Sequence, residues 1–246
     1  MYSIIRHQEN RANDLWSVVG MAKTHGIEAY VVAIYNLEDE DGAVLSSHVA
    51  DYLRVSRPTV TQTIRRLASL DLVESAAGRG IVLTENGRMR AEQVIRRHRL
   101  LERWLHDELN IGWAETHVEA DRLEHAVSPL VEERLMEKLG FPTTCPHGNA
   151  IPGSGYRQPK GNLLSEYASG ATVQILRICE QAEDNMELLT LFHDVGLVPG
   201  AMVYIVGRED IPGHDVEMQL RIDKETFPLM KNAAKWIVVN EKSTTA

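Results

Sequence analysis

Imidazole and carboxylate side chains recur at intervals of three or four residues in the middle of the chain. The first predicted helix of this region carries His98 and Glu102, and the next carries His117, Asp121, Glu124 and His125. Residues at these spacings share one face of a helix, so two antiparallel helices would bring the six groups together. Nitrogen and oxygen donors suit Mn2+ and also accommodate Fe2+. The spacing therefore predicts a site for one or two divalent cations, although charged groups at helical spacing are also common on solvated surfaces.

A second small cluster follows in a segment that is rich in proline and glycine. Cys145 and His147 are separated by a single residue. Thiolate and imidazole both bind metals, but a lone Cys-x-His pair is usually structural. By itself, this pair is only a weak indication of a second metal site.

The elements that precede these helices predict a winged helix-turn-helix. Three short helices are expected within residues 27–70, and a β-hairpin within residues 72–83. Ser56 can cap the third helix, with Pro58 in its first turn. In a winged helix, the third helix enters the major groove of DNA and the hairpin contacts the backbone.

The predicted recognition helix offers side chains that can read or hold DNA. They are Ser56, Arg57, Pro58, Thr59, Thr61, Gln62 and Arg65. A glutamine can pair with adenine through two hydrogen bonds, and threonine methyl groups can contact thymine methyl groups. Arg79, at the tip of the hairpin, is placed for the phosphate backbone or the minor groove. The alternative is a helical bundle with a hairpin and no role in DNA binding.

The distribution of charge favours the DNA-binding interpretation. The 246 residues carry a net charge of −9, which would argue against nucleic acid as a partner. Residues 54–103, however, contain eleven arginines and five acidic residues, so this segment alone carries +6. A basic segment of this kind is commonly a solvated helix face, but here it coincides with the winged-helix pattern.

The composition also indicates in which cellular compartment the protein acts. No run of about 18 apolar residues occurs, so no membrane-spanning helix is expected. The N-terminus has no apolar segment of the kind found in signal peptides. Two cysteines are too few for a disulfide framework. We expect a cytoplasmic protein that has no membrane partner and no small organic substrate.

The remaining pattern divides the chain into five parts. A long helix follows the hairpin, two shorter helices come next, and a segment rich in proline and glycine precedes four short predicted strands. The strands, at 171–179, 202–206, 216–222 and 236–239, are expected to form a half-open or closed small barrel. The predicted divisions are an extension (1–26), a winged helix-turn-helix domain (27–93), a helical domain (94–150), a linker (151–165) and the barrel (166–242).

Four segments closely resemble the diphtheria toxin repressor family of metal-dependent repressors, particularly its manganese transport regulator branch. They are SRPTVTQTIRRLASLDLV (56–73), RHRLLER (97–103), HVEADRLEHAVS (117–128) and CPHGNAIPG (145–153). The resemblance implies a mainly α fold. It combines a winged helix-turn-helix, a helical dimerisation and metal-binding domain, and a C-terminal SH3-like β-barrel.

The resemblance also implies ligands. The primary set would be His98, Asp121, Glu124 and His125, and the second set would be Glu102, Cys145 and His147 with Asp184 or Glu183. Asp121 stands where the iron-sensing branch has a cysteine, which supports manganese. Ala29 stands where the family usually has a further methionine or aspartate ligand.

These observations predict a homodimeric repressor of metal-homeostasis genes that binds palindromic operators when Mn2+, or alternatively Fe2+, is bound. Because Ala29 cannot ligate a metal, a metal-independent winged-helix regulator of the same fold remains an alternative. A metallohydrolase that uses the same cluster is a third possibility, disfavoured by the absence of an HExxH motif. We expect no catalytic residues.

Overall fold

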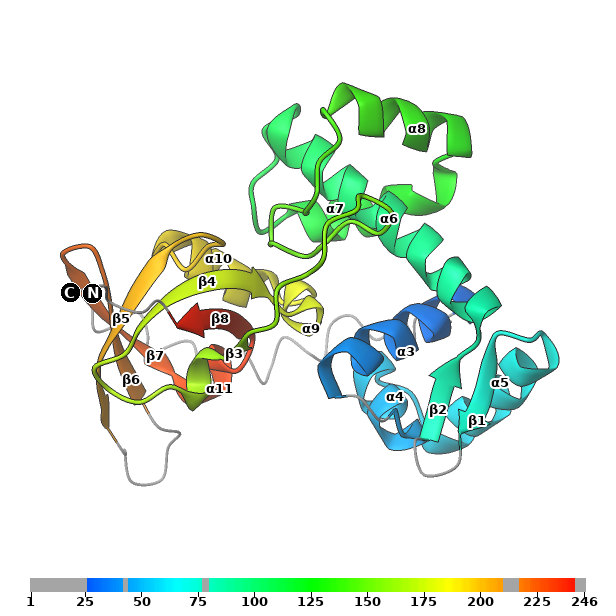
Figure 1. The fold of residues 1–246 in the computed structure, drawn as a ribbon, viewed down its shortest axis with the longest axis horizontal. Helices are drawn as coiled ribbons and strands as arrows, with labels where there is room; N and C mark the ends of the chain where they lie inside the picture. Colours follow the sequence, from blue (N-terminus) through cyan, green and yellow to red (C-terminus); the bar gives the residue numbers. More distant parts are fainter. Residues whose placement is uncertain (1–25, 42–43, 77–79, 210–216, 242–246) are drawn as a thin grey trace.

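The computed structural model describes residues 26–41, 44–76, 80–209 and 217–241. It has a helical N-terminal unit with a small hairpin, a central helical region and a C-terminal antiparallel sheet (Figure 1). One long helix, α6, joins the first two parts. Among the described residues, no helix combines the length and apolar composition needed to cross a bilayer. The expected N-terminal extension lies almost wholly outside the described residues.

The N-terminal unit is the predicted winged helix-turn-helix. Its elements are α3 (Ile27–Asp41), α4 (Ser46–Leu53), α5 (Arg57–Ser69), β1 (Val73–Ala76) and β2 (Gly80–Leu83). The two strands pair antiparallel. Their buried faces share one core with the three helices and with the beginning of α6.

Helix α6 (Glu85–Asp107) runs without interruption across residues 93 and 94, where the sequence predicted a domain boundary. Thr84 caps it, because the Thr84 hydroxyl accepts a hydrogen bond from the Gly87 amide at 3.0 Å. Ala91 in its first half packs in the N-terminal core. Leu101 in its second half packs with the central helices. One helix therefore belongs to both regions.

The helix predicted over 114–128 is shorter than expected. It comprises α7 (Thr116–Leu123) and a tighter 3-10 turn, η1 (Glu124–Ala126). Pro129 disfavours helical geometry at the residue before it, and Ser128 is extended and caps the next helix, α8 (Pro129–Lys138). The chain therefore leaves the helix several residues earlier than apolar periodicity suggests.

The C-terminal region is a six-stranded antiparallel sheet in the order β3-β8-β4-β5-β6-β7. Its strands are β3 (Asn162–Leu163), β4 (Thr172–Ile178), β5 (Met202–Glu209), β6 (Glu217–Ile222), β7 (Glu225–Met230) and β8 (Ile237–Glu241). Among these strands, β3 and β7 do not pair, so the predicted closure into a barrel is not found. β3 spans only two residues and pairs only with β8, which leaves little strand for closure.

Two of these strands, β3 and β7, were not predicted from the sequence. Pro228 lies within β7, and proline weakens a strand pattern because it cannot donate a ladder hydrogen bond. An edge strand tolerates it. Between the strands lie the short helices α9 (Glu180–Glu183), α10 (Met186–Asp194) and α11 (Lys231–Ala234), and the turn η2 (Leu164–Glu166).

Candidate metal centre and nucleic-acid surface

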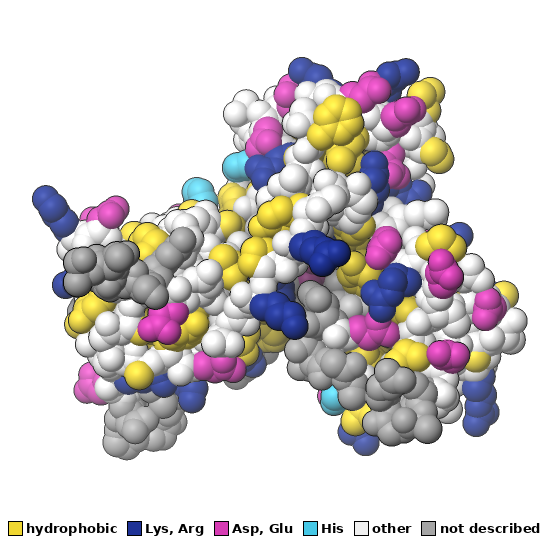
Figure 2. Space-filling view, in the orientation of Figure 1, with side chains coloured by type: hydrophobic (Ala, Val, Ile, Leu, Met, Phe, Trp, Pro, Cys, Tyr) yellow, Lys and Arg dark blue, Asp and Glu magenta, His cyan; other side chains and the backbone are white. Residues whose placement is uncertain are grey.

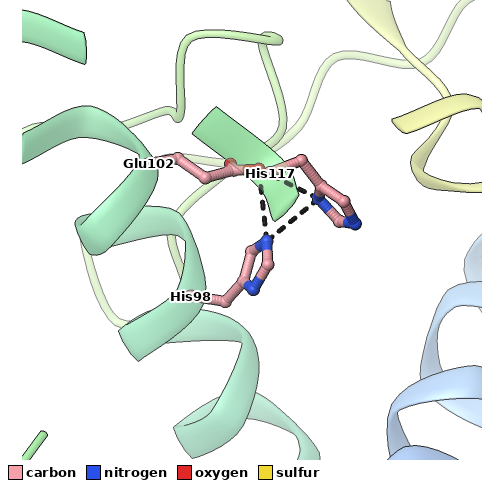
Figure 3. Close-up of side chains that lie close together, drawn as sticks. All are labelled: His98, Glu102 and His117. Carbon is pink, nitrogen blue, oxygen red and sulfur yellow. Dashed lines mark hydrogen bonds and ion pairs between the residues drawn. The ribbon is translucent and has the colours of Figure 1, made fainter. Parts of the chain in front are cut away.

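A buried cluster of imidazoles and carboxylates lies where α6, α7, the segment after α8, and α9 meet. Figure 3 shows His98 and Glu102 projecting from α6 toward His117 of α7. His147 approaches from the segment after α8, and Glu183 from α9. An ion pair between Arg99 and Glu180, with 2.7 Å between Nη2 and Oε2, ties α9 to α6.

Two carboxylate oxygens and two imidazole nitrogens form the centre of this cluster. His117 Nδ1 lies 3.1 Å from Glu102 Oε1 and 3.1 Å from Glu183 Oε2. His147 Nδ1 lies 3.5 and 3.4 Å from the same two oxygens. His98 Nε2 adds a further nitrogen, 3.2 Å from Glu102 Oε1 and 3.0 Å from His117 Nδ1. Three nitrogens and two oxygens therefore face one another.

This arrangement fits a divalent cation. A cation bound to nitrogen and oxygen at about 2.1 Å holds neighbouring ligand atoms about 3.0 to 3.4 Å apart, close to the observed separations. Glu102 is fully buried, and its Oε2 has no hydrogen-bond partner among the described residues. Nδ1 of the buried His147 makes only the two long contacts to Glu102 and Glu183 given above. A buried polar atom without a partner is costly, and a cation would satisfy Glu102 Oε2 and shorten the contacts around His147 Nδ1.

The pKa values show how the cluster is balanced without a metal. Burial lowers the pKa of His117, but hydrogen bonds to Glu102 and Glu183 outweigh it and raise the pKa to about 9. Burial also opposes protonation of His98 and His147, yet Glu102 and Glu124 raise the pKa of His98, and Glu183 and Glu102 raise the pKa of His147, both well above the usual range. Burial raises the pKa of Glu102 and of Glu183, and the imidazolium charges lower both overall. Protons thus occupy the positions that a cation would take.

Cys145 borders the cluster. Its sulfur, a Glu102 oxygen and a His147 nitrogen all lie within 4.8 Å of one another. Burial, and then the charge of Glu102, raises the pKa of the Cys145 thiol to about 12. At neutral pH the thiol therefore keeps its proton unless a cation displaces it.

The other predicted ligands are placed differently. Glu124 is buried and its Oε2 lies 2.8 Å from His98 Nδ1. Asp121 and His125 are exposed, and neither belongs to the groups of potential ligands found among the described residues. The Asp184 side chain is 67% exposed, with Oδ1 3.8 Å from His117 Nε2.

Two residues beside the cluster were missed at the sequence level. The backbone carbonyl of Trp113 accepts a hydrogen bond from His147 Nε2 at 3.0 Å. Asn149 Nδ2 donates to Glu183 Oε1 at 2.6 Å. Asn149 falls within the CPHGN run, which is the only sequence signal for it. A backbone carbonyl leaves no signal in the residue type.

Ala29 lies in α3 and packs against the N-terminal core. Its neighbour Glu28 pairs with Arg90 of α6, with 2.7 Å between Oε1 and Nη2. These contacts attach the first turn of α3 to α6 through an ion pair.

The predicted recognition helix is α5. Arg54 has a positive φ of 53° at the end of α4, and the chain turns through three residues into α5. The Ser56 hydroxyl accepts a hydrogen bond from the Thr59 amide at 3.3 Å, which confirms the predicted cap. All the predicted DNA-reading residues of this helix are exposed: Ser56, Arg57, Pro58, Thr59, Thr61, Gln62 and Arg65. Arg79 lies outside the described residues.

An exposed helix suited to a DNA groove and a buried cluster that fits a divalent cation, on one chain, point to a class: DNA-binding proteins that respond to metal. Comparison with known families identifies it further. Residues 23–81 match the iron dependent repressor N-terminal DNA binding domain, and residues 84–153 match the iron dependent repressor metal binding and dimerisation domain. Residues 162–241 match the FeoA domain.

Relatives that align with about three quarters or more of the chain agree with these family matches. The iron-dependent repressor IdeR of Mycobacterium leprae is 38% identical over 205 residues, covering 76% of this chain and 89% of IdeR. The diphtheria toxin repressor of Corynebacterium diphtheriae is 34% identical, covering 78% and 91%. A solved manganese-dependent transcriptional repressor in complex with manganese has 31% identity and a TM-score of 0.77, covering 88% of this chain and all of that chain. ScaR with bound Cd2+ has 29% identity and a TM-score of 0.74, covering 89% and 100%.

The chain therefore belongs to the iron-dependent repressor family, which includes the diphtheria toxin repressor, as the sequence motifs predicted. It is a metal-dependent DNA-binding transcriptional repressor and not an enzyme, so the hydrolase alternative is wrong.

Proposed function

We propose that the chain represses metal-homeostasis genes by binding palindromic operators as a homodimer when Mn2+ occupies the buried cluster. The observation that carries this proposal is the set of nitrogen and oxygen atoms, 3.0 to 3.5 Å apart, around His117. Nitrogen and oxygen donors suit Mn2+, and Fe2+ is the alternative cation. The names of the relatives include both metals.

The ligands in this proposal are His98, Glu102, His117, His147 and Glu183. When bound, the cation supplies positive charge that neutralises the two carboxylates. The three imidazoles then bind as neutral groups, each through the nitrogen that faces the carboxylates, and release protons. Cys145 borders these five residues, and its thiol would join them only where the cation displaces its proton.

Helix α6 connects this centre to the DNA-binding unit without a ligand from α3. His98 and Glu102 lie in its second half, while Ala91 and Ile95 pack in the winged-helix core. Two ion pairs, Arg90 with Glu28 and Arg88 with Glu38, hold α3 against the first turns of α6. A cation that fixes α7 and α9 against α6 therefore fixes them relative to the recognition helix as well.

The dimer surface in this proposal is formed by α7, α8 and the turn after α8. Large apolar side chains are exposed there: Leu123, Leu130, Val131 and Phe141. Figure 2 shows hydrophobic side chains over this region at the top of the view. Exposed apolar groups of this kind mark interaction surfaces, and the matched dimerisation domain covers the same residues. A second copy would place two α5 helices at half-sites about 34 Å apart.

Duplex DNA selected from a random-sequence library by the full chain in the presence of Mn2+ provides the test. Fluorescence anisotropy then compares binding in Mn2+, in anaerobic Fe2+ and in chelator. We expect tight binding with metal and loss of it in chelator. Equal affinity for DNA in chelator would instead favour a metal-independent regulator, the alternative raised because Ala29 cannot ligate a metal.

A further inference from the structure

The five proposed ligands are not equally buried. The side chains of His98, Glu102, His147 and Glu183 are at most 9% exposed, whereas that of His117 is 13% exposed. The two carboxylates lie deepest, because Glu102 has no exposed side-chain area and Glu183 almost none. A cation that comes from solvent must therefore pass other side chains before it meets the carboxylates, and His117 is the most accessible of the five ligands.

The His117 ring reaches from the centre toward the surface. Its Nδ1 faces the buried oxygens of Glu102 and Glu183, each 3.1 Å away. Its Nε2 lies 3.8 Å from Asp184 Oδ1 instead. Figure 3 shows this second nitrogen on the side of the ring that faces away from His98 and Glu102. The imidazole therefore stands between Asp184 and the buried carboxylates.

Asp184 lies at the surface, although the residue before it belongs to the centre. It follows α9 directly, and its side chain is largely exposed. Within the described ranges, no lysine or arginine pairs with Asp184. By contrast, Glu180 at the other end of α9 is paired with Arg99. The charge of Asp184 is therefore not neutralised by a cationic side chain and is available to a cation from solvent.

We infer that Asp184 is the first contact of the cation on its way into the metal centre, and holds it beside His117 Nε2 before it reaches the buried carboxylates. This inference rests on the proposed metal centre. The sequence resemblance named Asp184 or Glu183 as a ligand. The structure directs Glu183 Oε2 into the centre and leaves Asp184 outside it. Asp184 thus holds the cation in passing, and the five buried residues hold it at the end.

This role has a kinetic signature. Carboxylates at the entrance of a site raise the local concentration of cations and increase association rates by about 10- to 1,000-fold, and salt screens the effect. A residue on the path is passed on exit as well as on entry. Its loss therefore slows both steps and changes the Kd little. Loss of a ligand, by contrast, acts mainly through faster dissociation.

The test is stopped-flow mixing of Mn2+ with the metal-free full chain, followed by tryptophan fluorescence. Trp113 reports on the centre, because its indole meets the His147 ring edge to face with centroids 4.5 Å apart. Asp184→Asn keeps the shape of the side chain and removes its charge, so the association rate should fall about 10-fold. Release of Mn2+ into excess chelator should slow to a similar extent, and the Kd from calorimetry should change by less than about 3-fold.

Two further comparisons separate charge from structure. Asp184→Glu keeps the carboxylate and should restore most of the lost rate. Raising the salt concentration from about 0.05 M to about 0.5 M should slow loading of the wild type more than loading of Asp184→Asn. Glu187→Gln is the matched control, because it removes an exposed carboxylate from the first turn of α10. This variant should load as fast as the wild type.

The outcomes separate this inference from the proposed centre. If Asp184→Asn loads and releases Mn2+ at the wild-type rates, Asp184 is not on the path. If it weakens the Kd about 10-fold by faster release alone, Asp184 is a ligand and the inference is wrong. Wild-type protein that binds no Mn2+ would overturn the proposed centre itself.

Discussion

His117 Nδ1 on α7 lies 3.1 Å from Glu183 Oε2 on α9, so two elements that are 66 residues apart in sequence meet at one imidazole. Glu183 is buried and belongs to the C-terminal region, whereas His117 belongs to the central helices. Asn149 holds the other oxygen of Glu183 at 2.6 Å. This contact joins the C-terminal sheet region to the helices, and several measurable consequences follow from its chemistry.

The stability of the metal-free protein should fall as pH rises from about 6.5 to 9. The folded-state pKa of His117 is raised to about 9, so the imidazolium form stabilises the fold fully below the unfolded value of about 6.5. This contribution is lost as pH rises through 9, at a cost of up to about 3 kcal/mol. Thermal unfolding in chelator across this range provides the measurement, and an unchanged Tm would contradict the prediction.

Metal affinity should show the opposite dependence on pH. Because Mn2+ requires neutral imidazoles, binding releases a proton from His117 below about pH 9, and further protons from His98 and His147, whose pKa values lie well above the usual range. Apparent affinity for Mn2+ should therefore increase from pH 6 to pH 9. Calorimetry in buffers of different ionisation enthalpy measures the released protons directly. No proton release at pH 7 would show that the cation binds elsewhere.

Glu183→Gln should weaken Mn2+ binding by at least about 10-fold, because it removes one anionic ligand from a buried centre. Its effect should also reach the C-terminal region, whose attachment to α7 it weakens. Hydrogen exchange of β8 and α9 with and without Mn2+ reports that attachment. Glu187→Gln, an exposed change on α10, is the control and should leave affinity and exchange unchanged.

Gln62→Ala should cost about 1–3 kcal/mol in binding to selected DNA, at particular base positions. Gln62 is exposed in the second turn of α5 and is free to reach a base edge. Binding to a panel of single-base variants of the selected site locates the affected bases. Ser69→Ala, at the far end of the same helix, should leave base preference unaltered. A uniform loss across all sequences would assign Gln62 to the backbone instead.

Leu130→Glu should weaken dimerisation, because it places a charge on the apolar surface of α8. The side chain is 61% exposed in the single chain, so the change should leave the fold of each chain intact. Analytical ultracentrifugation with Mn2+ should show a shift toward monomer. Met202→Glu, at a 42% exposed methionine on β5, should not. A dimer unchanged by Leu130→Glu would place the interface elsewhere.

Local signals in the sequence predicted the helices well, because their caps are encoded by nearby residues. Ser56 and Thr84 cap their helices as their positions suggest. The strands at the edges of the sheet were harder to predict. β3 is only two residues long, and Pro228 interrupts the strand pattern of β7. The expectation of a half-open or closed barrel was not confirmed, and the described strands do not close, because closure depends on pairing between distant strands, which no local pattern specifies.

The residues of the metal centre also differ in whether local sequence spacing predicts them. His98 and Glu102, four residues apart on one continuous helix, were predicted to lie together and do so. His125 was expected on the same face as His117, but α7 gives way to a 3-10 turn at Glu124. Because a 3-10 turn has 3.0 residues and not 3.6, the helical spacing rule fails there. Glu183 contacts the centre only through tertiary packing, and the sequence analysis named it only as an alternative to Asp184.

The continuity of α6 has a mechanical consequence. Helix α6 has 23 residues; the winged helix is attached at its first residue, Glu85, and the metal centre lies up to 17 residues further on, at Glu102. Over the roughly 26 Å between these residues, a tilt of about 7° displaces one end by about 3 Å. That displacement is close to the 3.4 Å step between successive nucleotides of DNA. Very small movements of His98 and Glu102 would thus be enough to move a recognition helix by one base pair.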